Sequence, residues 1–246
     1  MRPLSAHEIL RIWEKGRDLH PLDRALMMLL PACSGMTWDS LSALPVGERD
    51  MMLFGLYEQT FGTMLKGFAE CPGCRERLEF DISTKDILKK QEKMSDRNEY
   101  VLDMNDKGIE VTYRLPTSLD LAAIADCEDV QSGRTMLAKR CILEAKKDSV
   151  QISENGLSTE VFDRLARRME EKDPGADVII NLLCPGCSRQ RQMTLDILVF
   201  LWTEISFRAR RLLGEVHILA SVYKWCEKDI LSMSPVRRQY YLDMVS

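Results

Sequence analysis

Apolar residues recur every three or four positions over most of the chain, a pattern that predicts a mainly helical protein. The longest such segment runs from Ile197 to about Tyr223, where one apolar stripe would follow a helix of roughly 40 Å. Arg208 interrupts the stripe. Its stem could pack on the core with the guanidinium in solvent, or it could form an ion pair at a partner surface, and Glu215 lies one heptad further on. Shorter helices are expected at 6–16, 22–30, 47–59, 135–145 and 158–171, from Leu119 onward, and after Ser234-Pro235.

Short apolar runs bounded by turn residues predict strands between these helices. Tyr100–Leu102 and Ile109–Leu115 flank a turn sequence at 105–108 and are expected to pair as a hairpin. Two further runs, Met64–Phe68 and Val178–Leu183, each precede a Cys-Pro-Gly-Cys sequence. The whole pattern predicts an α+β fold that is mainly helical, with a small antiparallel β centre of zinc-ribbon type built from two Cys-x-x-Cys knuckles. The charged segment 83–98 is expected to be a frayed helix or a linker.

The sequence Cys-Pro-Gly-Cys occurs twice, at 71–74 and at 184–187, with 109 residues between the copies. A two-residue gap lets both sulfurs of a copy approach one ion, and proline with glycine favours a tight turn whose amides point at the sulfurs. Each copy is followed by a short predicted strand that ends at an Asp-Ile pair, expected to open a helix at Ile82 and at Ile197. We therefore expect two half-ribbons that face each other and clamp distant parts of the chain around one ion.

The thiols of Cys71, Cys74, Cys184 and Cys187 match the ligand set of a tetrahedral structural Zn²⁺ site. Two disulfides, free thiols or a dithiol oxidoreductase would use the same residues. A redox site of thioredoxin type needs one reactive pair in a βαβ setting, so the duplicated pair favours zinc. A four-cysteine site leaves no coordination position open for water or substrate, which makes the expected ion structural.

The rest of the sequence offers no catalytic constellation. The other four cysteines, Cys33, Cys127, Cys141 and Cys226, stand singly in helical or apolar contexts and are expected to be core residues. None of the three histidines lies near a serine or cysteine in a nucleophile motif, and there is no glycine-rich phosphate loop. We expect neither an enzyme nor a protein that binds a small-molecule substrate.

Charge is nearly balanced, with 34 basic and 38 acidic residues in 246, so nucleic acid is not attracted by the chain as a whole. The knuckle tips nevertheless carry Arg75, Arg77, Arg189 and Arg191. These arginines could form a phosphate-binding surface, which makes a nucleic-acid-binding zinc-ribbon protein the alternative function. They could equally offset the formal charge of −2 on a four-thiolate zinc centre. The second interpretation is favoured because no long basic stripe with interleaved aromatic residues is present.

Several short motifs, taken in their order along the chain, resemble those of the T4-type baseplate hub assembly chaperone family. Similar proteins are encoded with contractile tails and with phage-like contractile injection systems. The motifs are Ile9–Gly16, Pro21–Leu26, Cys71–Phe80, Arg114–Ser118, Cys184–Cys187, Phe200–Trp202 and Ile230–Arg238. The resemblance implies a zinc-stabilised assembly factor or structural component of a baseplate, with hub or wedge proteins as partners. It carries no catalytic residues over to this chain, and it leaves open whether such a protein stays in the finished particle.

The sequence also suggests where the protein acts and how it divides. No window approaches the length of a bilayer span, and the N-terminus leads into a polar amphipathic helix, so we expect it in the bacterial cytoplasm during assembly. That reducing compartment keeps the ligand thiols available for metal. We expect an N-terminal helical part (1–62), a first half-ribbon (63–83), a hairpin and helical middle part (84–175), a second half-ribbon (176–196), and a C-terminal long helix with a cap helix (197–246).

Overall fold

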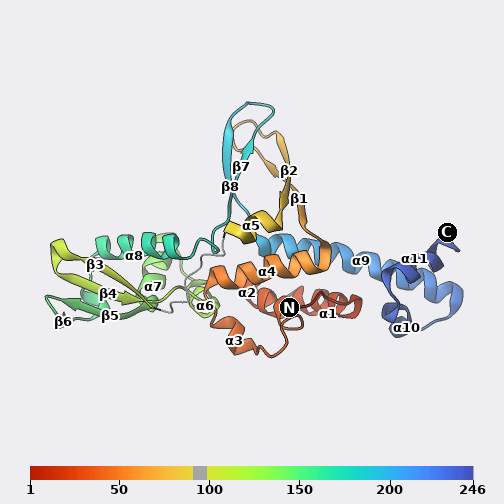
Figure 1. Cartoon of the computed structure of the whole chain (residues 1–246), viewed down its shortest axis with the longest axis horizontal. Helices are drawn as coiled ribbons and strands as arrows, with labels where there is room; N and C mark the ends of the chain where they lie inside the picture. The colour runs from red at the N-terminus through yellow and green to blue at the C-terminus, as the bar shows by residue number, and fades with distance from the viewer. Residues whose placement is uncertain (91–98, 246) are drawn as a thin grey trace.

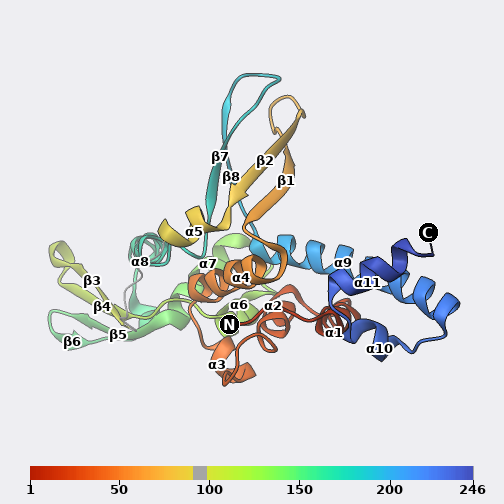
Figure 2. The ribbon, with the colours of Figure 1, turned by 45° about the vertical axis from the view of Figure 1, so that its right-hand side comes forward.

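The computed structural model describes residues 1–90 and 99–245. Figure 1 shows an elongated molecule with a helical body at its centre, a sheet-containing lobe at one end and a small helical lobe at the other. Two β-hairpins rise side by side from the body, and Figure 2 shows the same projection after a 45° turn. We call this projection, residues 64–83 and 179–194, the arm.

The central body is built on the long amphipathic helix predicted from the sequence. This helix, α9, spans Ile197–Tyr223, the predicted bounds, and Asp196 caps it by accepting hydrogen bonds from the amides of Leu198 and Val199 at 2.9 and 3.2 Å. Its apolar stripe is buried against the N-terminal helices. At the α1 crossing, a Cβ on Gly16 would lie 2.8 Å from the Trp202 ring, so glycine permits the close approach. The N-terminal helices are α1 (Ala6–Gly16), α2 (Pro21–Leu29), α3 (Trp38–Ser42) and α4 (Val46–Phe61).

The arm consists of two separate antiparallel hairpins, with a Cys-Pro-Gly-Cys knuckle at the tip of each. The strands are β1 (Met64–Glu70), β2 (Arg77–Ser83), β7 (Ile179–Leu183) and β8 (Gln190–Thr194). The arm is anchored on α9 because the Phe80 and Phe200 rings pack with their centroids 5.8 Å apart. The expected helix start at Ile82 is wrong, because β2 pairs with β1 as far as Ser83 and α5 (Thr84–Lys90) begins only at Thr84. The rest of the charged segment, 91–98, lies outside the described residues.

The sheet lobe has a hydrophobic core of its own. Its strands, in the order β3-β4-β5-β6, are β3 (Tyr100–Met104), β4 (Ile109–Tyr113), β5 (Ile142–Lys147) and β6 (Val150–Gln151). The hairpin predicted from 100–115 is confirmed. Its helices are α6 (Ser118–Ile124), α7 (Val130–Cys141) and α8 (Thr159–Lys172), with single 3-10 turns at Asn105–Lys107 and Glu154–Gly156.

The C-terminal end of one helix in this lobe was predicted too far along the chain. The helix expected at 135–145 ends at Cys141, and Ile142 begins strand β5, which pairs with β4. The apolar spacing up to Ala145 also suits a helix, but pairing with β4 satisfies the backbone of β5 and buries Ala145 in the core.

A buried carboxylate holds the sheet lobe together at the start of α6. The side chain of Asp120 is 1% exposed and accepts hydrogen bonds from Arg114 at 2.5 and 3.0 Å, from Arg140 at 3.1 Å and from Thr117 at 2.9 and 3.0 Å. Burial alone would raise the pKa of Asp120, but these hydrogen bonds, chiefly from Arg114, outweigh it and lower the pKa to about 2.

The lowered pKa of Asp120 predicts an acid-sensitive lobe. Its stabilising effect is complete above the unfolded pKa of about 3.9 and is lost as the pH falls toward 2, so it contributes about 2–3 kcal/mol at neutral pH. We expect Asp120→Asn to lower the free energy of unfolding by about this amount at pH 7 and by much less at pH 2. Urea titrations followed by circular dichroism at both pH values measure the difference. The exposed Asp106→Asn is the control, and equal losses at the two pH values would contradict the assignment.

The C-terminal lobe closes around the far end of α9. Helices α10 (Glu227–Ser232) and α11 (Pro235–Asp243) pack there in a small separate core, and Ser234 caps α11 as predicted. Glu215 on α9 is buried and accepts a hydrogen bond from Arg238 of α11 at 2.6 Å and one from Arg211 at 3.0 Å. Glu215 therefore faces a helix of its own chain. Among the described helices, none combines the length and hydropathy needed to cross a bilayer.

Candidate metal centre

The two hairpins bring four cysteines together at the tip of the arm. The sulfurs of Cys71, Cys74, Cys184 and Cys187 all lie within 4.8 Å of one another. Across the hairpins, Cys71 and Cys187 sulfurs are 3.8 Å apart and Cys74 and Cys184 sulfurs 3.4 Å apart. These distances far exceed a disulfide bond of about 2.05 Å. They are close to the edge of about 3.8 Å expected for a tetrahedron with metal–sulfur bonds of about 2.3 Å.

The backbone of the two knuckles repeats the same hydrogen bonds. The amide of Arg75 donates to the Cys71 carbonyl at 2.8 Å, and the amide of Ser188 donates to the Cys184 carbonyl at 2.8 Å. Arg75 and Ser188 adopt left-handed conformations, with φ of 62° and 55°. The left-handed residue of each turn is thus the one after the second cysteine and is not the knuckle glycine.

Backbone amides point at the sulfurs, as the sequence predicted. Hydrogen bonds from the Gly73 and Cys74 amides lower the pKa of Cys71 to about 6, and the Arg189 amide lowers the pKa of Cys187. The Glu76 amide acts on Cys74 in the same direction, but the neighbouring thiols and burial outweigh it and raise the pKa of Cys74 to about 12. Four crowded sulfurs cannot all ionise by themselves, so this arrangement favours binding of a cation.

Burial separates the two cysteines of each knuckle. Cys71 and Cys184 are fully buried, whereas Cys187 is half-buried and Cys74 is exposed. A small apolar cluster that includes Leu78, Leu182 and Met193 packs below the sulfurs. The residues present therefore fit one metal ion held by four thiolates. The apolar cluster would shield the ion on one side, and the exposed Cys74 would leave it close to the surface on the other.

Comparison with known proteins places the chain in a family. The sequence model of one protein family, described as T4 bacteriophage base plate protein, matches residues 6–201. The chain belongs to this base plate family. The match covers the N-terminal helices, the arm, the sheet lobe and the first turn of α9, and it ends before the rest of α9 and the C-terminal lobe. No curated protein and no solved structure matches the chain. The family description places the protein in the baseplate and does not specify a role as an assembly chaperone.

The five arginines singled out from the sequence lie in different surroundings in this base plate protein. Arg191 lies against Gly73 of the first knuckle, and the Cys71 and Cys187 thiols raise its pKa. Arg77 lies over the Phe68 ring at 4.1 Å and is 3.4 Å from Glu79. Arg75 and Arg189 are part of the knuckle turns. Arg208 lies outside the arm on α9, where it lines a cavity next to the C-terminal lobe.

The remaining cysteines divide in a way that the sequence did not predict. Cys33 and Cys141 are buried as expected, and burial raises the pKa of Cys141 to about 12. Cys127 is half-buried. The prediction for Cys226 is wrong, because it is exposed at the N-cap of α10, where its thiol donates to Asp229 at 3.1 Å.

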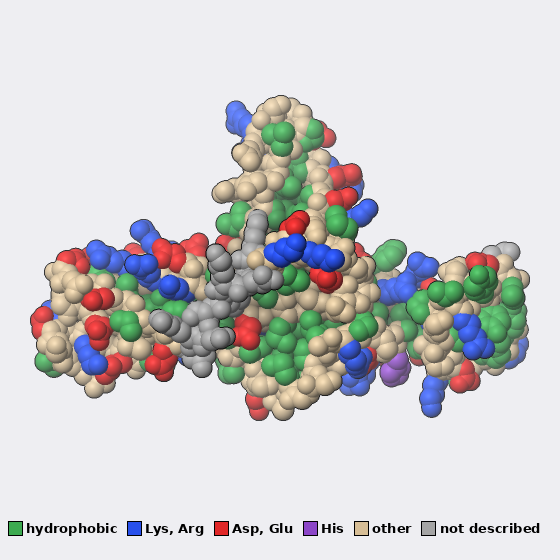
Figure 3. All heavy atoms as spheres, in the orientation of Figure 1, with side chains coloured by type: hydrophobic (Ala, Val, Ile, Leu, Met, Phe, Trp, Pro, Cys, Tyr) green, Lys and Arg blue, Asp and Glu red, His purple; other side chains and the backbone are tan. Residues whose placement is uncertain are grey.

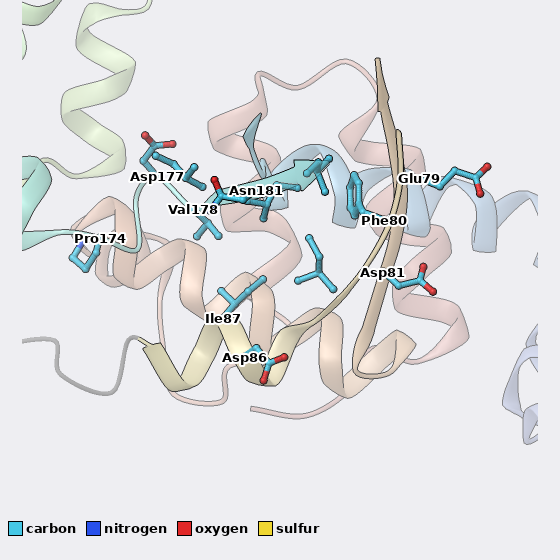
Figure 4. Close-up of a pocket in the computed structure, with 13 residues that line it drawn as sticks. Glu79, Phe80, Asp81, Asp86, Ile87, Pro174, Asp177, Val178 and Asn181 are labelled. Atoms are coloured by element: carbon cyan, nitrogen blue, oxygen red, sulfur yellow. The ribbon is translucent and has the colours of Figure 1, made fainter. Parts of the chain in front are cut away.

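A cleft of about 590 Å³ lies between the two hairpins. Its walls are β2, α5 and β7. Among the described strands, β2 pairs with β1 alone and β7 pairs with β8 alone. Figure 4 shows Phe80 and Ile87 directed toward the cleft, whereas Glu79 and Asp81 point away from it on the outer face of β2. Sequence analysis missed this feature of the base plate protein. The alternating apolar residues of β2 and the nearly continuous apolar run of β7 were the available signal, but nothing in the sequence shows that the strands stand apart.

Proposed function

We propose that this base plate protein is a zinc-stabilised assembly factor or structural component of the baseplate of a contractile phage tail or phage-like injection system. The observation that carries the proposal is the cluster of four sulfurs within 4.8 Å, built from two hairpins of a base plate family chain. Its partners would be baseplate hub or wedge proteins, met in the bacterial cytoplasm where the particle assembles.

The donor set supports zinc as the ion. Tetrahedral four-thiolate sites are typical of Zn²⁺ or of iron–sulfur centres, and a closed four-coordinate Zn²⁺ site is structural. When bound, the ion would supply a cross-link between residues 71–74 and 184–187. The chain's own amides would stabilise the thiolates, and the two hairpins would be held at a fixed angle for contact with a neighbouring subunit.

Nucleic-acid binding is less well supported. Arg191 lies against the first knuckle and Arg77 covers Phe68, so two of the four arginines are engaged within the arm. Figure 3 shows basic and acidic side chains interspersed over the sheet lobe on the face that it displays. Binding to nucleic acid would need an uninterrupted basic surface.

Removal of the gene from a producing strain tests the proposed role. We expect the strain to make few complete baseplates and few contractile particles, and a plasmid copy should restore both. Electron microscopy of purified particles counts assembled baseplates, and metal analysis of the purified protein should give one zinc per chain. Normal particle yield without the gene would contradict the role, and iron or no metal would contradict the proposed ion.

A further inference from the structure

Arg191 connects the two hairpins at the metal centre. It lies on β8 of the second hairpin, and its Nη2 lies at Gly73 in the first knuckle, next to the Cys71 sulfur. The Cys71 thiol, and less strongly the Cys187 thiol, raises the pKa of the guanidinium. Its Nε is buried without a hydrogen-bond partner among the described residues. The guanidinium of the second hairpin therefore reaches into the first knuckle, beside the sulfurs.

Gly73 lies directly against this guanidinium. A Cβ on Gly73 would overlap Nη2 of Arg191 and would lie 3.4 Å from its Cζ. The φ of Gly73 is not in the left-handed region, so the backbone there admits other residues. The equivalent Gly186 differs, because a Cβ there would meet Glu76 at 3.2 Å and the Cys74 sulfur at 3.4 Å, contacts that small shifts relieve.

We propose that Arg191 is the positioning and charge-balancing residue of the metal centre, and that position 73 is glycine because the Arg191 guanidinium occupies the space of a side chain. This inference rests on the metal site of the proposed function. Four thiolates with one divalent ion carry a formal charge of −2, and one guanidinium halves it. Because Arg191 belongs to the second hairpin and lies against the first knuckle, it also fixes the two knuckles relative to each other, which is the role of contacts around the ligands in other metal sites.

Zinc affinity measured on the purified full-length protein tests the proposal. Competition with a chromogenic zinc chelator should show that Arg191→Ala binds zinc about 10–100-fold more weakly than the natural chain, and that Arg191→Lys recovers part of the loss. Arg77→Ala, on the other hairpin, should stay within about twofold, because the Arg77 side chain lies over the Phe68 ring and near Glu79, away from the sulfurs.

A double-mutant cycle tests the role of Gly73. Gly73→Ala should weaken zinc binding when Arg191 is present, and it should have little further effect in Arg191→Ala, where the space is empty. Gly186→Ala is the matched control and should have a small effect in both backgrounds. If Gly73→Ala costs the same in the two backgrounds, Gly73 serves the turn itself and this part of the inference is wrong.

Cobalt substitution separates a charge-balancing role from a merely structural one. Co²⁺ in Arg191→Ala should keep the visible bands of tetrahedral four-sulfur coordination, while the sulfur-to-cobalt charge-transfer band moves to lower energy because the sulfurs lose a neighbouring positive charge. An unchanged band with unchanged zinc affinity would overturn the inference about Arg191. If the natural chain itself binds neither metal, the proposed metal site fails instead, so the two failures are distinguishable.

Discussion

Replacement of Cys187 by serine is expected to release the metal ion and unfold the arm while the central body stays folded. Structural zinc supplies on the order of 10 kcal/mol of apparent folding free energy, whereas the apolar cluster below the sulfurs is small. The body core is formed mainly by α1 to α4 and α9, and it also includes Leu65 at the base of the arm, so the loss should be greatest in the part of the arm beyond this base. Limited trypsin digestion with mass spectrometry should show early cleavage at Lys66, Arg77 and Arg189, together with loss of zinc.

Two controls keep this expectation specific to the metal centre. Cys226→Ser changes an exposed thiol outside the site and should leave the zinc content and the digestion pattern unchanged. Chelation of the natural protein should reproduce the digestion pattern of Cys187→Ser. If Cys187→Ser retains zinc and resists trypsin in the arm, the four-cysteine site is not what holds the hairpins together.

Replacement of Arg238 by methionine is expected to lower the free energy of unfolding of the C-terminal lobe by about 3–5 kcal/mol. The Arg238 side chain is 2% exposed, and its Nε donates to Glu215 at 2.6 Å while its Nη1 donates to the Met233 carbonyl at 3.2 Å. Methionine fills a similar space but leaves the buried Glu215 carboxylate with only Arg211, whose side chain is half exposed. Hydrogen exchange of the α10 and α11 amides measures the loss locally.

A second variant separates the lost ion pair from lost packing. In Glu215→Leu/Arg238→Met the buried charge is gone, so much of the stability should return. Arg237→Met, an exposed neighbour whose guanidinium lies 5.9 Å from the Tyr241 ring centroid, should cost less than about 1 kcal/mol. If the double variant is as unstable as Arg238→Met alone, the guanidinium acts through packing and not through charge.

The fold was predictable wherever local signals agreed. Helix α9 combines a long apolar stripe with an Asp196 cap, and its predicted bounds are confirmed. Strand β5 was missed because Ala138, Cys141 and Ala145 keep helical spacing up to the end of the segment. Pairing with β4 decides its conformation, and that pairing is not a local property of the sequence.

The candidate site shows the same limit. The clustering of the four cysteines was predictable because their spacing alone brings two sulfurs into each turn. Which arginine would lie beside the sulfurs was not, because Arg189 in the turn and Arg191 on β8 are only two residues apart, and the position of the other hairpin decides between them. The exposure of Cys226 was missed, although the charged residues around it, Lys224, Glu227 and Lys228, were the available signal.

The separation of the two knuckles along the chain also sets the order of events on the ribosome. The first knuckle emerges 109 residues before the second, a delay of roughly 5–20 s at usual translation rates. Helix α9, which completes the core of the body, is translated directly after the second knuckle. The nascent chain thus carries an incomplete metal site and an open core until nearly the same moment, so metal capture and closure of the body become possible together.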